Sequence, residues 1–213
     1  MLFCAAAIVL PSCENTTSNS LNGVLISDSL DPRAQYTSVS ASDAWINVPR
    51  SALVVERQLR GDRAQRVLLP NHTYLTGDNV IYLRAIQNRL SGTLGVFDLE
   101  AMLRFIGGVP RPFTREELSL MRSRSDAAGT LTWAVWTDGA GTYCVLALRR
   151  LTERQRIVPF RSNAIDILIR NCVRGTEEEA LKPATPAQVA YPTIGRNVPT
   201  SPQTLSPLAA PLP

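Results

Sequence analysis

The sequence has only one histidine, His72, among its 213 residues. Zinc sites built on two histidines and the HExxH motif are therefore excluded, because each needs at least two imidazole ligands. No run of 18 or more apolar residues occurs, so no internal membrane-spanning helix is predicted. The P-loop, GxSxG and GxGxxG motifs are also absent, and the enzyme classes that carry them are not indicated.

Lysine is almost absent, since Lys182 is the only one and the other 21 of the 22 basic residues are arginines. A compositional bias explains most of this preference. The charge is unevenly placed, because residues 50–174 carry 19 arginines against 11 acidic residues, a net charge of +8. A basic middle segment suits an anionic surface such as lipid headgroups or acidic glycans. It lacks the dense basic clusters with interleaved aromatic residues of a nucleic-acid site, so no nucleic-acid partner is expected.

Candidate catalytic residues do not form a recognisable set. Asp98 and Glu100 are two positions apart in a predicted helix, so they point to different sides. His72 lies in a predicted turn without a serine or aspartate partner by motif, and a surface position is expected for it. The sequence therefore predicts no catalytic residues, no metal site and no cofactor.

Two tryptophans are the strongest candidates for stacking on sugar rings. Trp133 and Trp136 lie in one predicted strand at positions that face opposite sides. We expect one of them in the core and the other at a surface or an interface.

The N-terminus has the features of an export signal. Residues 1–13 form a short apolar stretch that ends in Leu10-Pro11-Ser12-Cys13, which resembles a bacterial lipobox with Cys13 as the lipidated residue. Glu14, rather than aspartate, follows this cysteine, which favours the outer membrane. A plain signal peptide or a buried N-terminal strand is the alternative, since no lysine or arginine precedes the apolar stretch.

Two further segments flank the predicted domain. Residues 14–50 are rich in Ser, Thr, Asn and Asp and are predicted to be a polar tether. Residues 183–213 hold eight of the 15 prolines and are predicted to be a disordered tail.

Residues 51–182 are predicted to hold one α+β domain with a largely antiparallel sheet of about six strands and two to three short helices. Turn residues, capping boxes and apolar periodicity indicate three strands, two helices, three strands and a last helix. The expected strands are 52–59, 65–69, 80–86, 130–136, 143–151 and 164–173, and the expected helices are 98–106, 114–122 and 176–181.

Two of the four cysteines lie in this predicted domain. Cys144 and Cys172 each fall in a predicted strand, and a disulfide is possible if the two strands are neighbours. Export to an oxidising compartment favours the bridge, and two buried free thiols are the alternative.

Three segments of the predicted domain stand out: Leu53-Val54-Val55-Glu56-Arg57 with Gln65 and residues 77–83, then residues 144–151, and finally residues 165–172 with 175–181. Taken in order, these segments resemble the BcsN family, which comprises accessory cellulose biosynthesis proteins of alphaproteobacterial cellulose operons. They cover the whole predicted domain. The resemblance implies a role in polysaccharide secretion without known catalytic residues, and the paired cysteines of the family fall on Cys144 and Cys172.

The leading hypothesis is a non-enzymatic, lipid-anchored accessory protein of the periplasm, acting in cellulose or related exopolysaccharide biosynthesis and export. Its expected partners are polysaccharide synthesis and export proteins, the membrane through the lipid anchor, and glucan. The first alternative is a structural or assembly lipoprotein of another envelope secretion machine. A glycan-modifying enzyme is the weaker alternative.

Overall fold

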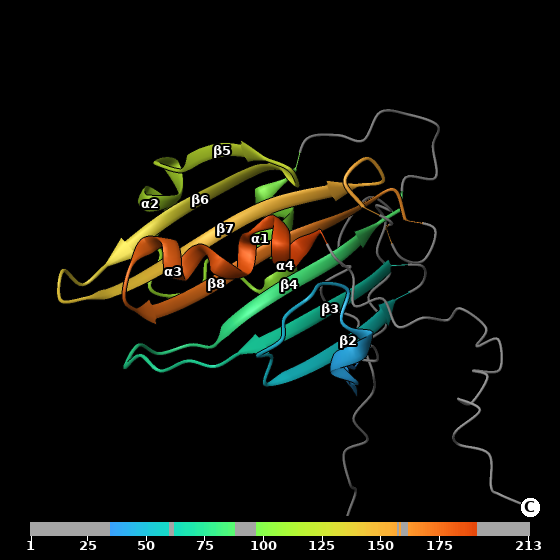
Figure 1. Cartoon of the computed structure of the whole chain (residues 1–213), viewed down its shortest axis with the longest axis horizontal. Helices are drawn as coiled ribbons and strands as arrows, with labels where there is room; N and C mark the ends of the chain where they lie inside the picture. Colours follow the sequence, from blue (N-terminus) through green and yellow to red (C-terminus); the bar gives the residue numbers. More distant parts are fainter. Residues whose placement is uncertain (1–34, 60–61, 88–96, 157, 159–161, 191–213) are drawn as a thin grey trace, which may run out of the picture.

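A computed structural model describes residues 35–59, 62–87, 97–156, 158 and 162–190. The chain forms one antiparallel sheet of eight strands in the order β1-β2-β3-β4-β8-β7-β6-β5 (Figure 1). The strands are β1 (Thr37–Val39), β2 (Leu53–Leu59), β3 (Asp62–Leu69), β4 (Asn79–Ile86), β5 (Arg122–Asp126), β6 (Gly129–Thr137), β7 (Thr142–Thr152) and β8 (Ala164–Arg174).

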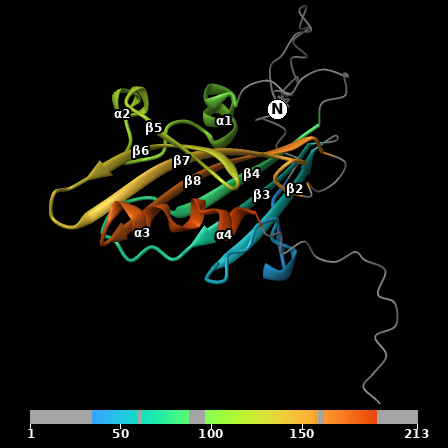
Figure 2. The same cartoon turned by 45° about the horizontal axis from the view of Figure 1, so that its top comes forward.

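Short helices cover both faces of this sheet. Figure 2 shows α1 and α2 over one face, with α3 and α4 over the other. None of the helices in the described ranges has the length and apolar character needed to cross a bilayer. The helices are α1 (Leu99–Ile106), α2 (Arg115–Ser119), α3 (Glu177–Leu181) and α4 (Pro186–Val189), with two 3-10 helices, η1 (Ala41–Asp43) and η2 (Lys182–Ala184).

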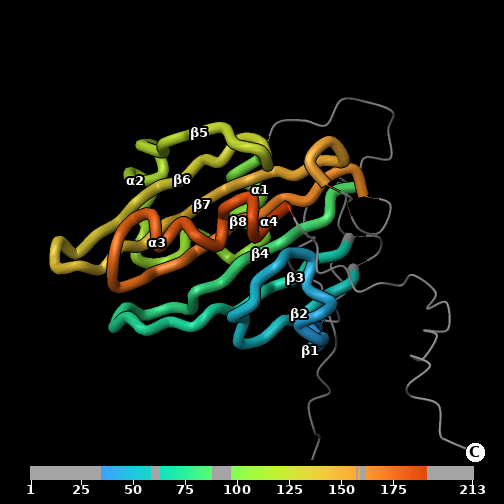
Figure 3. Tube along the Cα trace, in the orientation of Figure 1, coloured from blue at the N-terminus to red at the C-terminus, as the bar shows by residue number. Residues whose placement is uncertain are grey.

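The predicted α+β class is therefore confirmed, while the expected number of strands was too small. All six predicted strands are present, and the two additional ones, β1 and β5, form the two edges of the sheet (Figure 3). Residues 120–122 were expected at the end of a helix. Instead α2 ends at Ser119, and the chain enters β5 at Arg122.

Each face of the sheet has its own apolar cluster, because successive side chains of a strand point to opposite sides. We call the face under α3 and α4 the α3/α4 face, and the face under α1 and α2 the α1 face. The α3/α4 face is built on buried residues that include Trp45, Ile81, Val145, Ile167, Leu181 and Val189. The α1 face is built on Met102, Leu103, Phe113, Leu146, Leu168 and the two cysteines, Cys144 and Cys172.

The helix ends follow the local sequence signals. Asp98 caps α1, since its carboxylate accepts a hydrogen bond from the backbone N–H of Ala101 at 2.9 Å. Gly107 ends α1 with φ of 100°, in the left-handed region that glycine adopts without strain. Thr176 and Glu179 form the predicted capping box of α3, with hydrogen bonds of 3.0 and 3.2 Å.

The fold extends beyond the predicted domain boundaries at both ends. The predicted tether was too long, because its residues 35–50 include β1 and the buried side chains of Trp45 and Ile46. The predicted tail also started too early. Ala184 and Val189 are fully buried, and the backbone N–H of Asn47 donates to the carbonyl oxygen of Gln188 at 2.9 Å. Both segments pack on the α3/α4 face, so the two ends of the described chain help to form its core.

Candidate functional site

A disulfide joins the two central strands of the sheet. Cys144 of β7 and Cys172 of β8 lie directly opposite each other in the register, with their Cα atoms 4.0 Å apart. The expected bridge is therefore confirmed. Both residues are almost completely buried within the α1 face, so the bond is shielded from soluble reductants.

Arginines from three neighbouring strands gather on the α1 face. Arg57 of β2 and Arg84 of β4 lie on either side of Ala64 of β3, since each is its direct partner in the register. The small side chain of Ala64 leaves room between them. Phe105 of α1 closes this gap, because its ring centroid is 5.2 Å from the guanidinium carbon of Arg57 and 5.3 Å from that of Arg84.

A third arginine continues this row along β3. The guanidinium carbon of Arg66 lies 4.3 Å from the ring centroid of Tyr36 and 5.4 Å from that of Tyr82. Arg57 also reaches the Tyr36 ring, at 5.0 Å. Cations over aromatic faces are held in place electrostatically while their N–H groups in the guanidinium plane stay able to donate. We call Tyr36, Arg57, Arg66, Tyr82, Arg84 and Phe105 the arginine–aromatic cluster.

Several polar atoms of this cluster are buried without a hydrogen-bond partner. Within the described part of the chain, they are Nε and Nη2 of Arg57, Nε of Arg66 and the hydroxyl of Tyr36. The described residues also place no carboxylate within ion-pair distance of Arg57 or Arg66. An unmade hydrogen bond of this kind costs about 1–3 kcal/mol, so the cluster lowers the stability of the unliganded fold.

The acidic residues nearest to the cluster are committed elsewhere. Asp166 of β8 accepts two hydrogen bonds from Arg150 of β7, from Nε at 2.5 Å and from Nη2 at 2.8 Å. These bonds raise the pKa of Arg150, and the charge of Asp98 adds to the effect. Burial raises the pKa of Tyr82, so its phenol stays neutral at physiological pH. Within the cluster, Arg57 and Arg66 are therefore the two arginines without a neutralising carboxylate among the described residues.

Arg170 is the deepest arginine of the α1 face, and it has a structural role. It is 2% exposed and donates to the carbonyl oxygens of Thr76, Gly77 and Arg111 and to the side chain of Asn79, at 2.7–3.1 Å. Burial lowers its pKa. Its donors hold the segment before β4 and the segment before α2 against β8.

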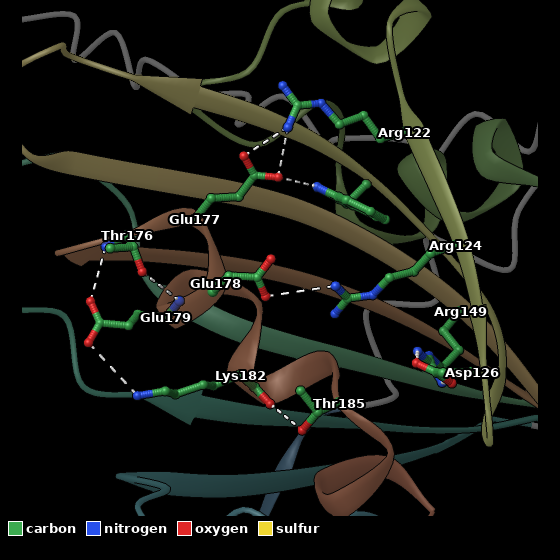
Figure 4. A network of polar contacts seen from close by, with 11 residues as sticks. Arg122, Arg124, Asp126, Arg149, Thr176, Glu177, Glu178, Glu179, Lys182 and Thr185 are labelled. Carbon is green, nitrogen blue, oxygen red and sulfur yellow. Dashed lines mark hydrogen bonds and ion pairs between the residues drawn. The ribbon is translucent and has the colours of Figure 1, made fainter.

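The acidic run at the start of α3 fastens that helix to the edge of the sheet. Glu177 accepts from Arg122 of β5 at 2.8 and 2.9 Å, and from the indole N–H of Trp133 at 2.8 Å. Glu178 reaches Arg124 at 3.7 Å (Figure 4). Trp133 is thus the core tryptophan, on the α3/α4 face. Trp136 points to the opposite, α1 face as expected, where it is half-buried against the apolar cluster, and its role at a surface or an interface stays a prediction.

The other residues singled out in the sequence do not come together. His72 is exposed in the loop between β3 and β4. Asp98 is the cap of α1, while Glu100 pairs with Arg115 at 2.7 Å, and this bond lowers the pKa of Glu100. Among the residues that the structure describes, no group of three or more His, Cys, Asp or Glu side chains is placed to hold a metal ion. Cys13 lies outside the described residues.

Comparison with known proteins gave no match to a family model, to a curated protein or to a solved structure.

Proposed function

We propose that this protein is a non-enzymatic, lipid-anchored accessory of the bacterial cell envelope that acts in the biosynthesis and export of cellulose or a related exopolysaccharide. It works by binding, from the periplasmic side of the outer membrane. Its partners are the proteins that synthesise and export the polymer, and glucan is a further candidate ligand.

The Cys144–Cys172 disulfide is the observation that carries this proposal. A buried bridge between two central strands is typical of proteins that fold in an oxidising compartment, such as the bacterial periplasm. The export signal expected over residues 1–13 fits the same compartment. The bridge also joins the two positions at which the resemblance to the BcsN family places paired cysteines.

The arginine–aromatic cluster supports a role in binding. No carboxylate of the described residues lies within ion-pair distance of Arg57 or Arg66, so the positive charge of these two arginines is held among aromatic rings without being neutralised.

Deletion of the gene tests the proposed role directly. The deletion strain is expected to make less surface polymer, or polymer of altered organisation, while synthase activity in isolated membranes stays unchanged. Normal polymer in the deletion strain would contradict the proposal. Cleavage or modification of a glucan by the purified protein would contradict its non-enzymatic part.

The anchor has its own test. Cys13→Ser is expected to move the protein from the membrane to the soluble periplasmic fraction. Cys4→Ser is the matched control, because Cys4 lies in the segment expected to be removed with the signal. Membrane fractionation that is the same in both variants would rule out lipidation at Cys13.

A further inference from the structure

We propose that Tyr74 and Trp136 form a binding platform for the sugar rings of a neutral glucan chain. The platform lies at the end of the sheet where β3 turns into β4 and β6 turns into β7 (Figure 1). It shares no residue with the arginine–aromatic cluster. This inference rests on the proposed function, because it names the place on the molecule at which the polymer is held.

Tyr74 presents its ring to solvent. It is 71% exposed, which makes it the most exposed aromatic residue in the part of the chain that the structure describes. A ligand therefore reaches the ring without any change in the fold. A tyrosine ring offers a large, rigid apolar surface to the C–H groups on one side of a pyranose, and its hydroxyl stays free to make polar contacts.

The orientation of this exposed ring is fixed by hydrogen bonds. The hydroxyl of Tyr74 donates to Oδ2 of Asp138 at 2.9 Å. Oδ1 of Asp138 in turn accepts from the backbone N–H groups of Ala140 and Thr142, at 2.8 and 2.9 Å. The bond to Asp138 raises the pKa of Tyr74, so the hydroxyl stays protonated and keeps donating at neutral pH. A ring that is already held in place loses little conformational entropy when a ligand stacks on it.

The loop that carries Tyr74 is also fastened on both sides of the ring. The side-chain amide of Asn71 donates to the carbonyl oxygen of Gly77 at 2.9 Å, which closes the loop. Buried Arg170 donates to the carbonyl oxygens of Thr76 and Gly77, both at 3.1 Å. The loop therefore presents Tyr74 in one defined position, as a preorganised binding site requires.

Trp136 extends the platform along β6. Asp138 follows it by two residues, so the two side chains leave the backbone on the same face, about 7 Å apart. Trp136 and Leu75, the neighbour of Tyr74, both pack against the apolar cluster of the α1 face and stay partly exposed. The bond between Tyr74 and Asp138 thus brings the exposed ring beside the indole of Trp136.

The charges around the platform favour a neutral ligand. The two charged side chains that act on the hydroxyl of Tyr74 are Asp138 and Arg174, and their charges are of opposite sign. An acidic glycan would need an excess of positive charge at this place. Aromatic faces with a few polar groups beside them suit a neutral sugar, since the rings take its apolar side and the polar groups take its hydroxyls.

Tryptophan fluorescence, with cellohexaose as the probe, tests this inference. Trp45 and Trp133 are 3% and 7% exposed, so a change on titration of the full chain reports on half-buried Trp136. A saturable change is expected at low millimolar cellohexaose. Tyr74→Ala is expected to weaken binding about tenfold, which corresponds to about 1.4 kcal/mol for one stacked ring.

Two further variants separate the ring from its surroundings. Tyr74→Phe keeps the ring but loses the bond to Asp138, and it is expected to weaken binding by about threefold at most. Leu53→Ala is the matched control, because it removes an exposed apolar side chain from β2, which four strands separate from β6. Its binding of cellohexaose is expected to equal that of the wild type.

Three results would overturn the inference. They are no fluorescence change with cellohexaose, an equal loss of binding in Tyr74→Ala and Leu53→Ala, and tighter binding of an oligogalacturonate of the same length, which would assign the surface to an acidic glycan. A failure here is distinguishable from a failure of the proposed function, because the deletion strain reports on the polymer whether or not Tyr74 binds glucan.

Discussion

The same strands form both faces of the sheet, but the arginines of the two faces differ in their counter-ions. On the α3/α4 face, buried Arg149 is matched by Asp126 through two hydrogen bonds of 2.6 and 2.7 Å. On the α1 face, Arg150 is matched by Asp166, while Arg57 and Arg66 have only aromatic rings around them among the described residues. One face uses its arginine for stability. The other holds two arginines, Arg57 and Arg66, without a counter-ion among the described residues, although a buried Nε without a hydrogen-bond partner occurs on Arg149 as well.

This difference indicates a division of roles. An arginine selected only for folding would have a counter-ion, as Arg149 has, or would be replaced by an apolar residue, since a desolvated charge without a partner weakens a fold. Sites that bind a ligand break this rule, because their hydrogen bonds are completed by the ligand. We therefore assign stability to the α3/α4 face and to the disulfide, and binding to the arginine–aromatic cluster.

Removing the partner of the buried arginine on the α3/α4 face should have the largest effect. Asp126→Ala leaves Arg149, whose side chain is 1% exposed, without its counter-ion. The expected loss is about 3–5 kcal/mol in the free energy of unfolding, measured with urea. Asp126→Ala/Arg149→Met should recover most of it, and a double variant as unstable as the single one would contradict the assignment.

The same pair predicts a pH dependence. The hydrogen bonds from Arg149 hold the pKa of Asp126 below its usual range. The folded pKa is therefore lower than the unfolded value of about 3.9, so the stabilisation is present above the unfolded pKa and is lost as the pH falls through the folded one. Asp126→Asn should flatten the loss of stability between about pH 5 and pH 2. An unchanged slope in that range would show that the pair does not contribute.

Loss of the disulfide should destabilise the domain slightly less. Cys144→Ala/Cys172→Ala removes a link between residues that are 28 apart in sequence, which corresponds to about 3–4 kcal/mol in the chain-entropy model. Reduction of the unfolded wild-type protein before refolding should give a similar loss. Two thiols that are readily alkylated in the exported, folded protein without reductant would show that the bridge does not form in the cell.

Truncation compares the two candidate ends of the folded domain. A chain ending at Lys182 loses buried Ala184 and Val189, and Arg156 loses the carbonyl oxygen of Val189, which it reaches at 2.8 Å. The expected loss is about 2–3 kcal/mol. A chain ending at Ala190 keeps these contacts and serves as the control, with a melting temperature expected to match that of the full chain. Equal melting temperatures of the two truncations would contradict the role of α4.

The sequence predicted the inner strands well and missed both edges, for one physical reason. Each inner strand is covered on one or both of its faces, so its apolar residues recur with the two-residue period that is typical of a strand. The edge strands have a polar surface, and their sequences, Thr-Ser-Val in β1 and Arg-Ser-Arg-Ser-Asp in β5, carry no such pattern. Their pairing depends on the neighbouring strand, which local sequence does not report.

The candidate site was predictable only in part. The disulfide followed from two cysteines in two predicted strands. The arginine–aromatic cluster did not, because Arg57, Arg66 and Arg84 belong to three strands and meet only through the register of the sheet. One signal was available in the sequence for Arg84, which stands between Leu83 and Ala85 in a mostly apolar strand. Arg57 and Arg66 have polar neighbours in their strands, so no such signal marks them.

The urea unfolding of Arg57→Gln/Arg66→Gln, measured beside that of Asp126→Ala, tests the division between the two faces most directly. If the arginines of the α1 face serve binding, their removal should leave the free energy of unfolding within about 0.5 kcal/mol of the wild type or raise it, because unpaired buried donors are lost. A loss of about 3 kcal/mol, comparable to that of Asp126→Ala, would show that Arg57 and Arg66 hold the fold together and would contradict the assignment.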